Sequence, residues 1–408
     1  MREKIGLHCD VISGYAFKTS DWKTEGVPVI KIGNISNGSD VIIDEATQYV
    51  DEEFLLSLNE RFVVSRGDIL ISLTGSHINQ PTSMVGRTCR NLSNNTYLLN
   101  QRAGKVMPFA NTEKQYLYYL LSTKAIKYDI ANRAYGGANQ VNVSPTDIKN
   151  IKWDFPSKVI QSTIANILLK YDELIEVNNQ RIKKLEQTAE ELYKEWFVRF
   201  RFPNYQNTEF ENGIPKGWLI KRLSDFGRVE TGKTPSTENS DNYGEKYMFV
   251  KTPDMHENTF VIQTEEMLSE IGNRSQPKKL LPTNSIMVSC IGTAGVVAIT
   301  TKPSHTNQQI NSIILNDLSE LEWMYQTCVS LRPSIIAFGA TGATMTNLSK
   351  GKFERLKVIY PTRELVNEYH VLTQPIFDRI KTILYCNQNL VKQRDLLLPR
   401  LMSGKLEV

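Results

Sequence analysis

The chain has 408 residues, of which 40% are hydrophobic and 23% charged, and its formal net charge is +4. These values are typical of a folded protein, exclude a disordered or fibrous chain, and predict two or three domains. Five scattered cysteines favour a reducing compartment. Because the N-terminus lacks a signal-peptide core and no long apolar run is present, we expect a cytoplasmic protein that does not span a membrane.

The first segment, residues 6–155, mixes strand and helix patterns. Short strand-like runs at 27–32, 41–43 and 68–73 lie between turns rich in Gly, Asn and Ser, and a helical pattern covers 112–133. This mixture predicts an α+β globule.

The next segment, residues 157–200, is a long helical pattern without Pro or Gly. Its apolar residues recur at alternating steps of four and three, which is a heptad seam that one helix buries against another. Ser157 fits as the N-cap, and Pro203 marks the latest end of the helix. A single buried core helix is the alternative, but the stripe is narrow and its flanks are charged. The seam consists of Ile164, Leu168, Tyr171, Ile175, Asn178, Ile182, Leu185, Ala189, Leu192 and Trp196.

A polar connector, residues 203–216, leads into a second half that repeats the first. The run GANQVNVS at Gly137 returns as GATMTNLS at Gly342, and IKWDFP at Ile151 returns as LKVIYP at Leu356, each displaced by 205 positions. Two separate matches at one displacement indicate an internal repeat. Looser matches upstream, with the lysine pair carrying the least weight, are DILISLTG at Asp68 with SIMVSCIG at Ser285, Asn100 and Gln101 with Asn307 and Gln308, and Lys31 with Lys251.

A second heptad pattern follows Thr362, another N-cap candidate. Pro375 interrupts it, so we expect the packed part of this helix to begin near Ile376. Asn178 and Asn387 either fix the register of the two helices or face solvent. The second seam consists of Tyr369, Thr373, Ile376, Ile380, Ile383, Asn387, Leu390, Arg394, Leu397 and Leu401.

The predicted fold class is α+β: two globular domains of related fold joined by two long helices that form an antiparallel coiled coil, with a pseudo-twofold axis. The helices must run antiparallel because the second one starts from the second globule and has to return along the first to bury its seam. This path brings the C-terminus near the N-terminus.

Motifs of catalysis are missing from the sequence. It contains no GxxxxGK[ST] loop, no GxGxxG after a strand, no HExxH, no CxxC, and no Asn-Pro-Pro-Tyr or Asp-Pro-Pro-Tyr run, and its five histidines are isolated. We therefore expect a non-catalytic chain with no metal site and no cofactor of its own.

The loops of both globules are rich in amides, hydroxyls and cations, which are groups that pair with base edges and phosphates. Two similar globules at a fixed separation suit a DNA duplex read at two half-sites. Asn142 and Asn347 are better explained as structural turn residues. The DNA-binding candidates of the first half are Tyr15, Lys18, Lys31, Asn34, Thr74, Ser76, Asn79, Asn100, Gln101, Arg102, Arg133, Asn139 and Gln140. Those of the second half are Lys233, Thr234, Lys251, Asp254, Thr293, Asn307, Gln308, Gln309 and Thr344.

Four stretches resemble the specificity subunit of type I restriction-modification systems, the HsdS family. They are VISGYAFKTSDW at Val11, KKLEQTAEELYKEWFVRFRFP at Lys183, IPKGWLIKRLSDFGRVETGKTPST at Ile214 and RDLLLPRLMSGKLEV at Arg394. The resemblance covers nearly the whole chain and implies two target-recognition domains, each reading one half of a bipartite, asymmetric DNA target. The implied boundaries are domain 1 at 1–156, a central helix at 157–202, a linker at 203–216, domain 2 at 217–361 and a C-terminal helix at 362–408.

The resemblance also implies partners. The paired helices would set the spacer between the half-sites and dock two methyltransferase (HsdM-type) subunits, which would bind S-adenosylmethionine. Restriction and translocase (HsdR-type) subunits would join them. Since the globules differ strongly outside the repeat, as in 36–51 against 255–270, different half-sites are expected. The competing hypothesis is a coiled-coil scaffold whose globular domains bind other proteins, and an enzyme ranks third.

Overall fold

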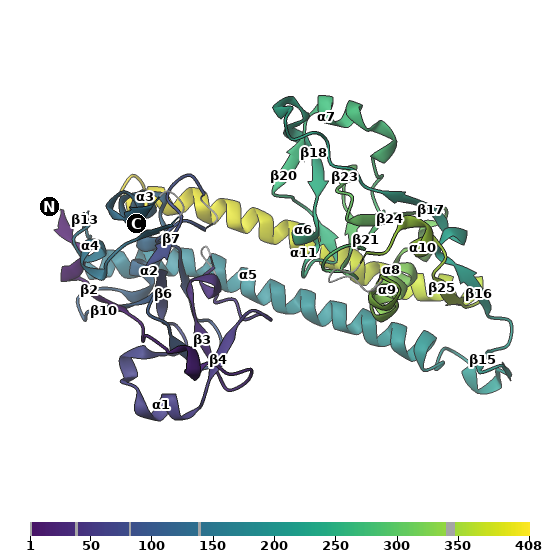
Figure 1. The fold of residues 1–408 in the computed structure, drawn as a ribbon, viewed down its shortest axis with the longest axis horizontal. Helices are drawn as coiled ribbons and strands as arrows, with labels where there is room; N and C mark the ends of the chain where they lie inside the picture. The colour runs from purple at the N-terminus through teal and green to yellow at the C-terminus, as the bar shows by residue number, and fades with distance from the viewer. Residues whose placement is uncertain (1, 37–39, 81–82, 138–139, 340–346) are drawn as a thin grey trace. The chain divides into compact units, whose positions relative to one another are not determined.

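The computed structural model describes residues 2–36, 40–80, 83–137, 140–339 and 347–408 (Figure 1). The chain forms two compact units. Unit 1 consists of residues 1–175 and 390–408, and unit 2 of residues 176–389. Two long helices, α5 (Lys158–Tyr193) and α11 (Arg363–Met402), each contribute one part to each unit. The candidates Asn139 and Thr344 lie outside the described residues.

Unit 1 contains two four-stranded sheets. The first, wholly antiparallel, has the order β2-β10-β6-β8, formed by Cys9–Ser13, Ala103–Pro108, Ile69–Ser72 and Thr88–Arg90. The second has the order β4-β3-β9-β5, formed by Gln48–Val50, Val27–Ile30, Tyr97–Leu99 and Val63–Val64, and its β3 and β9 run parallel. Smaller pairings join β11 (Tyr135–Gly137), β12 (Gln140–Asn142) and β7 (Thr74–Gly75), and β1 (Glu3–Lys4) with β13 (Lys152–Trp153).

The helices of unit 1 are α1 (Glu53–Ser57), α2 (Lys114–Ser122), α3 (Lys124–Arg133) and α4 (Pro145–Lys149). The helical pattern predicted at 112–133 is therefore two helices. Thr123 separates them because its hydroxyl donates to the Leu120 carbonyl (2.7 Å) and accepts from the Ile126 amide (3.3 Å), so it ends one helix and caps the next.

Unit 2 repeats this plan. Its main sheet has the order β17-β24-β21-β22-β19, formed by Gly227–Thr231, Ile310–Leu315, Ile286–Ser289, Val297–Thr300 and Phe260–Val261. The second sheet has the order β20-β18-β23, formed by Glu266–Leu268, Tyr243–Val250 and Ser304–Thr306, with β18 and β23 parallel. Smaller pairings join β16 (Leu219–Arg222) with β25 (Lys357–Tyr360), and β14 (Phe210–Glu211) with β15 (Ile214–Pro215). Its helices are α6 (Thr252–Met255), α7 (Glu270–Ser275), α8 (Leu321–Ser330), α9 (Arg332–Gly339) and α10 (Lys350–Glu354).

The predicted seams line the contact between α5 and α11. Every seam residue of both helices is buried or half-buried. In unit 2 the Asn178 amide donates to Asn387 (2.8 Å), which in turn donates to Asn179 (2.9 Å), so both residues lie inside the seam and the solvent-facing alternative is wrong. In unit 1 the core that holds Ile5 also holds Leu401, so both ends of the chain belong to one unit, as predicted.

The expectation that the packed part of the second helix begins near Ile376 is wrong. The helix is continuous from Arg363 to Met402 and passes through Pro375. Tyr369, one turn and a half earlier, is fully buried, while Pro375 is exposed and Val371, whose carbonyl loses its helical partner, is 69% exposed. Water can hydrate this carbonyl on the exposed face, so the proline does not stop the helix.

Candidate nucleic-acid interface

In unit 1 the ends of several strands bring candidate residues together. The parallel strands β3 and β9 end side by side, and the Asn100 amide donates to the Ile30 carbonyl (3.0 Å), which places Asn100 next to Lys31. The Tyr15 amide donates to the Leu99 carbonyl (2.7 Å). In the loop that begins at Asn100, the Arg102 carbonyl accepts a hydrogen bond from the Leu73 amide (3.0 Å), which places Thr74 close to this loop.

A glycine makes this close approach possible. A Cβ atom at Gly14 would lie 2.3 Å from the Leu99 carbonyl oxygen, and one at Gly232 in unit 2 would lie 2.2 Å from the Asn307 carbonyl oxygen. No other residue has the room at either point. The two glycines thus mark the same crossing in both repeats.

Lys31 has a neutral and aromatic surrounding. Its ammonium group donates to the Gln48 side chain and lies 3.9 Å from the centre of the Trp22 ring. Burial lowers the pKa of Lys31 below that of an ordinary lysine. Aromatic rings also brace Tyr15, which lies 5.0 Å from Phe17 between ring centres. The positive charge of Lys31 is therefore held in place without a carboxylate from any of the described residues.

The other candidates of unit 1 divide by exposure. Lys18 and Arg102 are exposed and make no ion pair with any residue in the described ranges, whereas Arg133 is paired with Asp129 (2.7 Å). Asn79, Gln101 and Gln140 are exposed amides. The buried candidates are bonded inside the unit: Asn34 to Ile42 and Thr47, Thr74 to Asn142, Ser76 to Gln80, and Asn100 to the Arg102 amide.

Unit 2 repeats the same backbone pairings with different side chains. The Asn307 amide donates to the Val250 carbonyl (3.2 Å), the Lys233 amide to the Thr306 carbonyl (2.9 Å) and the Cys290 amide to the Gln309 carbonyl (2.7 Å). These bonds match those of unit 1 one for one. The matched positions are Tyr15 and Lys233, Lys31 and Lys251, Asn100 and Asn307, Gln101 and Gln308, and Arg102 and Gln309. The sequence match given least weight, Lys31 with Lys251, therefore joins equivalent residues.

The charge of Lys251 is neutralised where that of Lys31 is not. Lys251 pairs with Glu266, the first residue of β20, just as Lys31 bonds to Gln48, the first residue of β4. The Lys251 amide is capped by the Asp254 carboxylate (2.8 Å), as the Lys31 amide is by Asn34 (2.9 Å).

The remaining candidates of unit 2 differ in their bonding and exposure. Thr234 donates to Gln308 (2.6 Å), and the buried Asn307 donates to Gln309 (3.1 Å). Lys233 and Thr293 are exposed, and Lys233 makes no ion pair with the residues that the structure describes.

Sequence reasoning missed the residues that set the state of each lysine: Gln48, Glu266 and Trp22. Trp22 could have been found, because it closes the stretch from Val11 that carries the family resemblance. Gln48 lies on β4, which pairs with β3, and Glu266 lies on β20, which pairs with β18. Only this strand pairing reveals that each residue faces the lysine at the end of the neighbouring strand.

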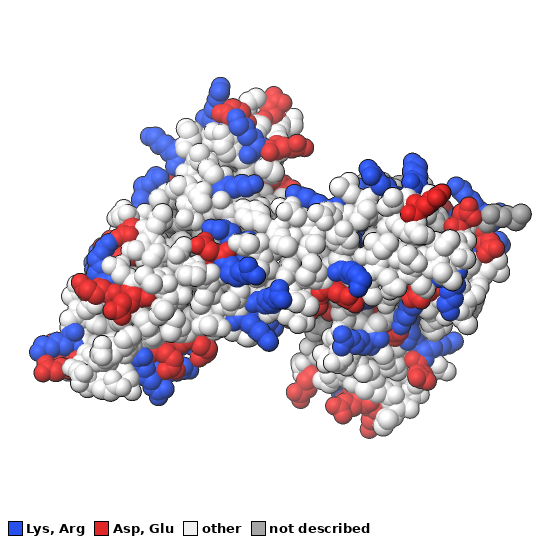
Figure 2. All heavy atoms as spheres, turned by 180° about the vertical axis from the view of Figure 1, so that it is seen from behind, with Lys and Arg blue, Asp and Glu red and all other residues white. Residues whose placement is uncertain are grey.

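Charge is mixed on the one face of the molecule that Figure 2 draws. Figure 2 shows Lys and Arg side chains interspersed with Asp and Glu rather than gathered into one basic field. No group of His, Cys, Asp and Glu in the described ranges is arranged to hold a metal ion. No described helix is long and apolar enough to cross a bilayer. The exposed polar loops are therefore the main candidate for recognition.

Comparisons with known proteins agree on one family. Residues 4–187 and 215–395 match the family model described as type I restriction modification DNA specificity domain. The chain is 32% identical over 378 residues to the type I restriction enzyme HindI specificity subunit of Haemophilus influenzae, covering 76% of this chain and 81% of that one. It is 27% identical to the MjaIX specificity subunit of Methanocaldococcus jannaschii, covering 78% and 74% of the two chains.

The fold has a counterpart among solved structures. The crystal structure of the type I restriction-modification system S subunit from M. genitalium superposes with a TM-score of 0.56 at 15% identity, covering 98% of this chain and 96% of that chain. This likeness concerns the fold alone. Together with the two matched specificity domains and the two packed long helices, it supports one conclusion: the chain belongs to the specificity (HsdS) subunits of type I restriction-modification systems, which are recognition subunits and not catalytic ones.

Proposed function

We propose that this chain reads a bipartite, asymmetric DNA target, with residues 1–156 reading one half-site and residues 217–361 the other. One observation carries the proposal: the two units share backbone pairings around the candidate loops but present different side chains at the matched points. Arg102 in unit 1 corresponds to Gln309 in unit 2, and Tyr15 to Lys233. Arg pairs with guanine and Gln with adenine, so different sequences are expected at the two half-sites.

The exposed candidates divide into two roles. Lys18 and Lys233 carry charges that no described carboxylate neutralises, which suits contacts to phosphates. The exposed Gln101, Arg102, Gln140 and Gln308, together with the half-buried Gln309, carry the planar groups that distinguish bases. The buried candidates, among them Asn34, Thr74 and Asn100, hold the loops in shape rather than touch DNA.

The long helices would serve as the ruler and as the docking surface of the complex. Two methyltransferase subunits, which would bind S-adenosylmethionine, and restriction and translocase subunits are the proposed partners, and the cytoplasm the proposed site of action. A coiled-coil scaffold that binds only proteins is the alternative. Affinity for DNA that falls steeply with salt, measured on the complex with its methyltransferase, separates the two, because a scaffold neutralises no phosphates.

A single exchange tests independent reading. Arg102→Gln copies the residue that unit 2 carries at the matched point, so the fold should be retained. We expect one half of the methylated motif to relax or change and the other half to stay the same, with a loss of about 1–3 kcal/mol in binding the original site. Methylation sites mapped across the genome give the readout, and Lys302→Gln, at an exposed position in a loop without a DNA-binding candidate, is the control. A change in both halves would contradict the proposal.

An insertion tests the ruler. Seven residues added after Arg181 in α5 and seven after Ile383 in α11, close to the Asn178–Asn387 pair, keep both seams in register. The pair lengthens by roughly 10 Å, about 3 base pairs of DNA. We expect unchanged half-sites and a spacer longer by about 2–3 base pairs. If a folded variant still methylates only the original spacing, the helices do not set it.

A further inference from the structure

Unit 1 contains a cavity of about 680 Å³ that none of the described DNA-binding candidates lines. Its walls come from the end of α2, the start of α3, β13 and the last turns of α11. The volume lies in the range of small-molecule sites, about 300–1,000 Å³. Its size therefore suits a small organic ligand rather than a bare ion.

The charged groups that line the cavity are predominantly positive. Five are cations and one is a carboxylate: Arg87, Lys124, Lys127, Arg394, Lys405 and Asp395. Arg394 is already paired with Asp395 (2.9 Å) and with Asp172 (2.7 Å), so the excess of positive charge does not depend on it. Lys124 and Lys405 make no ion pair with any residue in the described part of the chain. An anion would satisfy this excess of positive charge.

Two further features favour a phosphate group. Burial lowers the pKa of Lys127 to about 8; the nearby Asp395 opposes this shift and Arg87 adds to it. A bound anion would stabilise the charged form of Lys127 and so offset the cost of its burial. Lys124 and Ala125 form the first turn of the ten-residue helix α3, whose N-terminus opens on the cavity. Backbone amides and the helix dipole attract negative charge at such a point.

The rest of the lining is aromatic and apolar. Rings of Tyr118, Tyr119, Tyr128 and Trp153 and side chains of Met84, Leu398 and Met402 complete it. Aromatic walls favour a flat ring, and cations stacked near such rings favour it further. The lining thus combines a place for a planar group with a place for phosphate.

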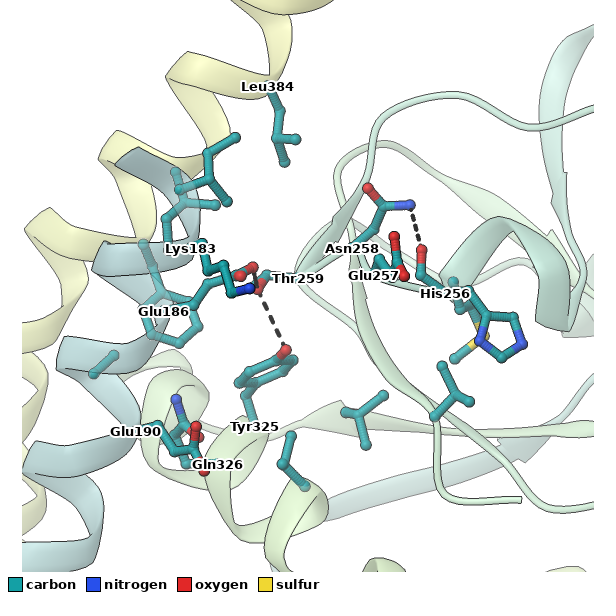
Figure 3. Close-up of a pocket in the computed structure, with 18 of the residues that line it drawn as sticks. Lys183, Glu186, Glu190, His256, Glu257, Asn258, Thr259, Tyr325, Gln326 and Leu384 are labelled. Carbon is teal, nitrogen blue, oxygen red and sulfur yellow. Dashed lines mark hydrogen bonds between the residues drawn. The ribbon is translucent and has the colours of Figure 1, made fainter. Parts of the chain in front are cut away.

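A cavity of unit 2 that shares part of this lining has the opposite character. It measures about 770 Å³ and uses Tyr325 and Gln326, which correspond to Tyr118 and Tyr119. Figure 3 shows Glu186, Glu190 and Glu257 around it, with Lys183 as the labelled cation. Glu186 accepts a hydrogen bond from Thr259, and burial raises the pKa of this carboxyl group. The basic lining is therefore a property of unit 1, not of the fold.

We propose that the cavity of unit 1 binds a nucleoside phosphate, with the base against Tyr128 and Trp153 and the phosphates against Lys124, Lys127 and Lys405. The site borders the recognition loops, since Arg87 donates to the Ile32 carbonyl (2.7 Å) and Met84 pairs with Ser76. Its volume holds one small molecule and not a duplex, so the occupant is a free mononucleotide rather than the DNA target.

Titration of the full-length chain with four ligands tests this assignment. Calorimetry with ATP, AMP, pyrophosphate and adenosine should show that the nucleotides bind at least tenfold tighter than pyrophosphate or adenosine. Pyrophosphate that binds as tightly as ATP would reduce the site to a basic patch and overturn the proposal. A 5′-phosphorylated oligonucleotide that displaces ATP more strongly than AMP does would assign the cavity to DNA and would also overturn it.

Two charge-reversed double variants complete the test. Lys124→Glu with Lys405→Glu should weaken ATP binding at least tenfold, with unchanged thermal unfolding and unchanged DNA binding by the loops. The matched control, Lys278→Glu with Lys302→Glu, changes two exposed lysines outside both cavities and should bind ATP as the original protein does. Equal loss in both variants, or no loss in the first, would disprove a nucleotide site in this cavity.

Discussion

The two units bury very different groups at the same place. In unit 1 Asp172 of α5 binds Arg90 (2.6 Å) and Arg394 (2.7 Å) and accepts a hydrogen bond from Tyr119 (2.6 Å). The displacement of 205 between the helices maps Asp172 to Phe377 and Arg394 to Ala189. Matched strand pairings map Arg90 to Ile299. All three counterparts belong to the apolar core of unit 2.

This contrast shows that a repeated fold does not require repeated contacts. Arg90 is 3% exposed and Asp172 12%, so the ions of unit 1 lie where unit 2 has hydrocarbon. Burial by itself would lower the pKa of Arg394, but the Asp172 carboxylate raises it above the usual range. An ion group of this kind contributes little net stability compared with apolar packing, yet breaking it leaves buried charge behind. The same place in the fold is thus robust in unit 2 and sensitive in unit 1.

Removing the central carboxylate should have the largest effect. Asp172→Asn leaves the buried Arg90 without its carboxylate and leaves Arg394 only the exposed Asp395, which should cost about 3–5 kcal/mol of the free energy of unfolding. Urea unfolding measures the loss, and hydrogen exchange should accelerate in residues 1–175 and not in 176–389. Asp395→Asn is the control, because that carboxylate is 56% exposed and should matter by less than about 1 kcal/mol. Uniform acceleration in both units would refute the local role.

Acid should weaken unit 2 through a residue that unit 1 lacks. His305 is fully buried, and burial lowers its pKa to about 4, while the matching position in unit 1 is Leu98. Its usual pKa is about 6.5, so the unfolded chain takes up the proton first, and stability present above that pH is lost as the pH falls toward 4. The expected loss is about 2 kcal/mol at pH 5. His305→Gln should reduce the difference in unfolding free energy between pH 7 and pH 5 by this amount. An unchanged difference would show that His305 does not cause the loss of stability in acid.

Exchanging the partners of the matched lysines should have a smaller effect, on DNA binding. Glu266→Gln gives unit 2 the residue that unit 1 has at this place, Gln48, and leaves Lys251 without a carboxylate. The free energy of DNA binding should become more favourable by about 1 kcal/mol, and the slope of log affinity against log salt concentration should steepen by about 1. Gln48→Glu should do the reverse at Lys31. Mobility shifts over a range of KCl concentrations test both variants. If neither changes the slope, these lysines do not face phosphates.

Converting the ion group of unit 1 to the residues of unit 2 should have the smallest effect. The variant combines Arg90→Ile, Asp172→Phe and Arg394→Ala with Tyr119→Phe, which removes the hydroxyl left without its acceptor. Its free energy of unfolding should stay within about 1 kcal/mol of the original or rise, because apolar packing can replace a buried ion pair at little cost. Thermal unfolding beside the Asp172→Asn variant gives the comparison. A combined loss as large as that of Asp172→Asn would show that the ions hold unit 1 together in their own right.

The sequence determined the features that depend on neighbours along the chain. Heptad spacing predicted both seams, the shared displacement of 205 predicted the repeat, and Ser157 and Thr362 start the two helices as expected, since the Gln161 and Val366 amides donate to their carbonyls. These features are local because helical periodicity and capping involve residues within about one turn of each other. Asn34, Lys31 and Arg102 could be named as polar loop residues, but not sorted into buried and exposed.

Only the tertiary structure decided what depends on residues far apart in sequence. Pro375 remains inside a helix because the Val371 carbonyl, which the proline leaves without its helical donor, lies on the exposed face. Lys251 is neutralised because β20 pairs with β18 and places Glu266 beside it. Asp172 becomes the centre of an ion group because packing places Arg90 of a strand and Arg394 of the second long helix around it. Charge, burial and cavity lining arise where separate elements meet, and neither periodicity nor composition specifies which side chains meet there.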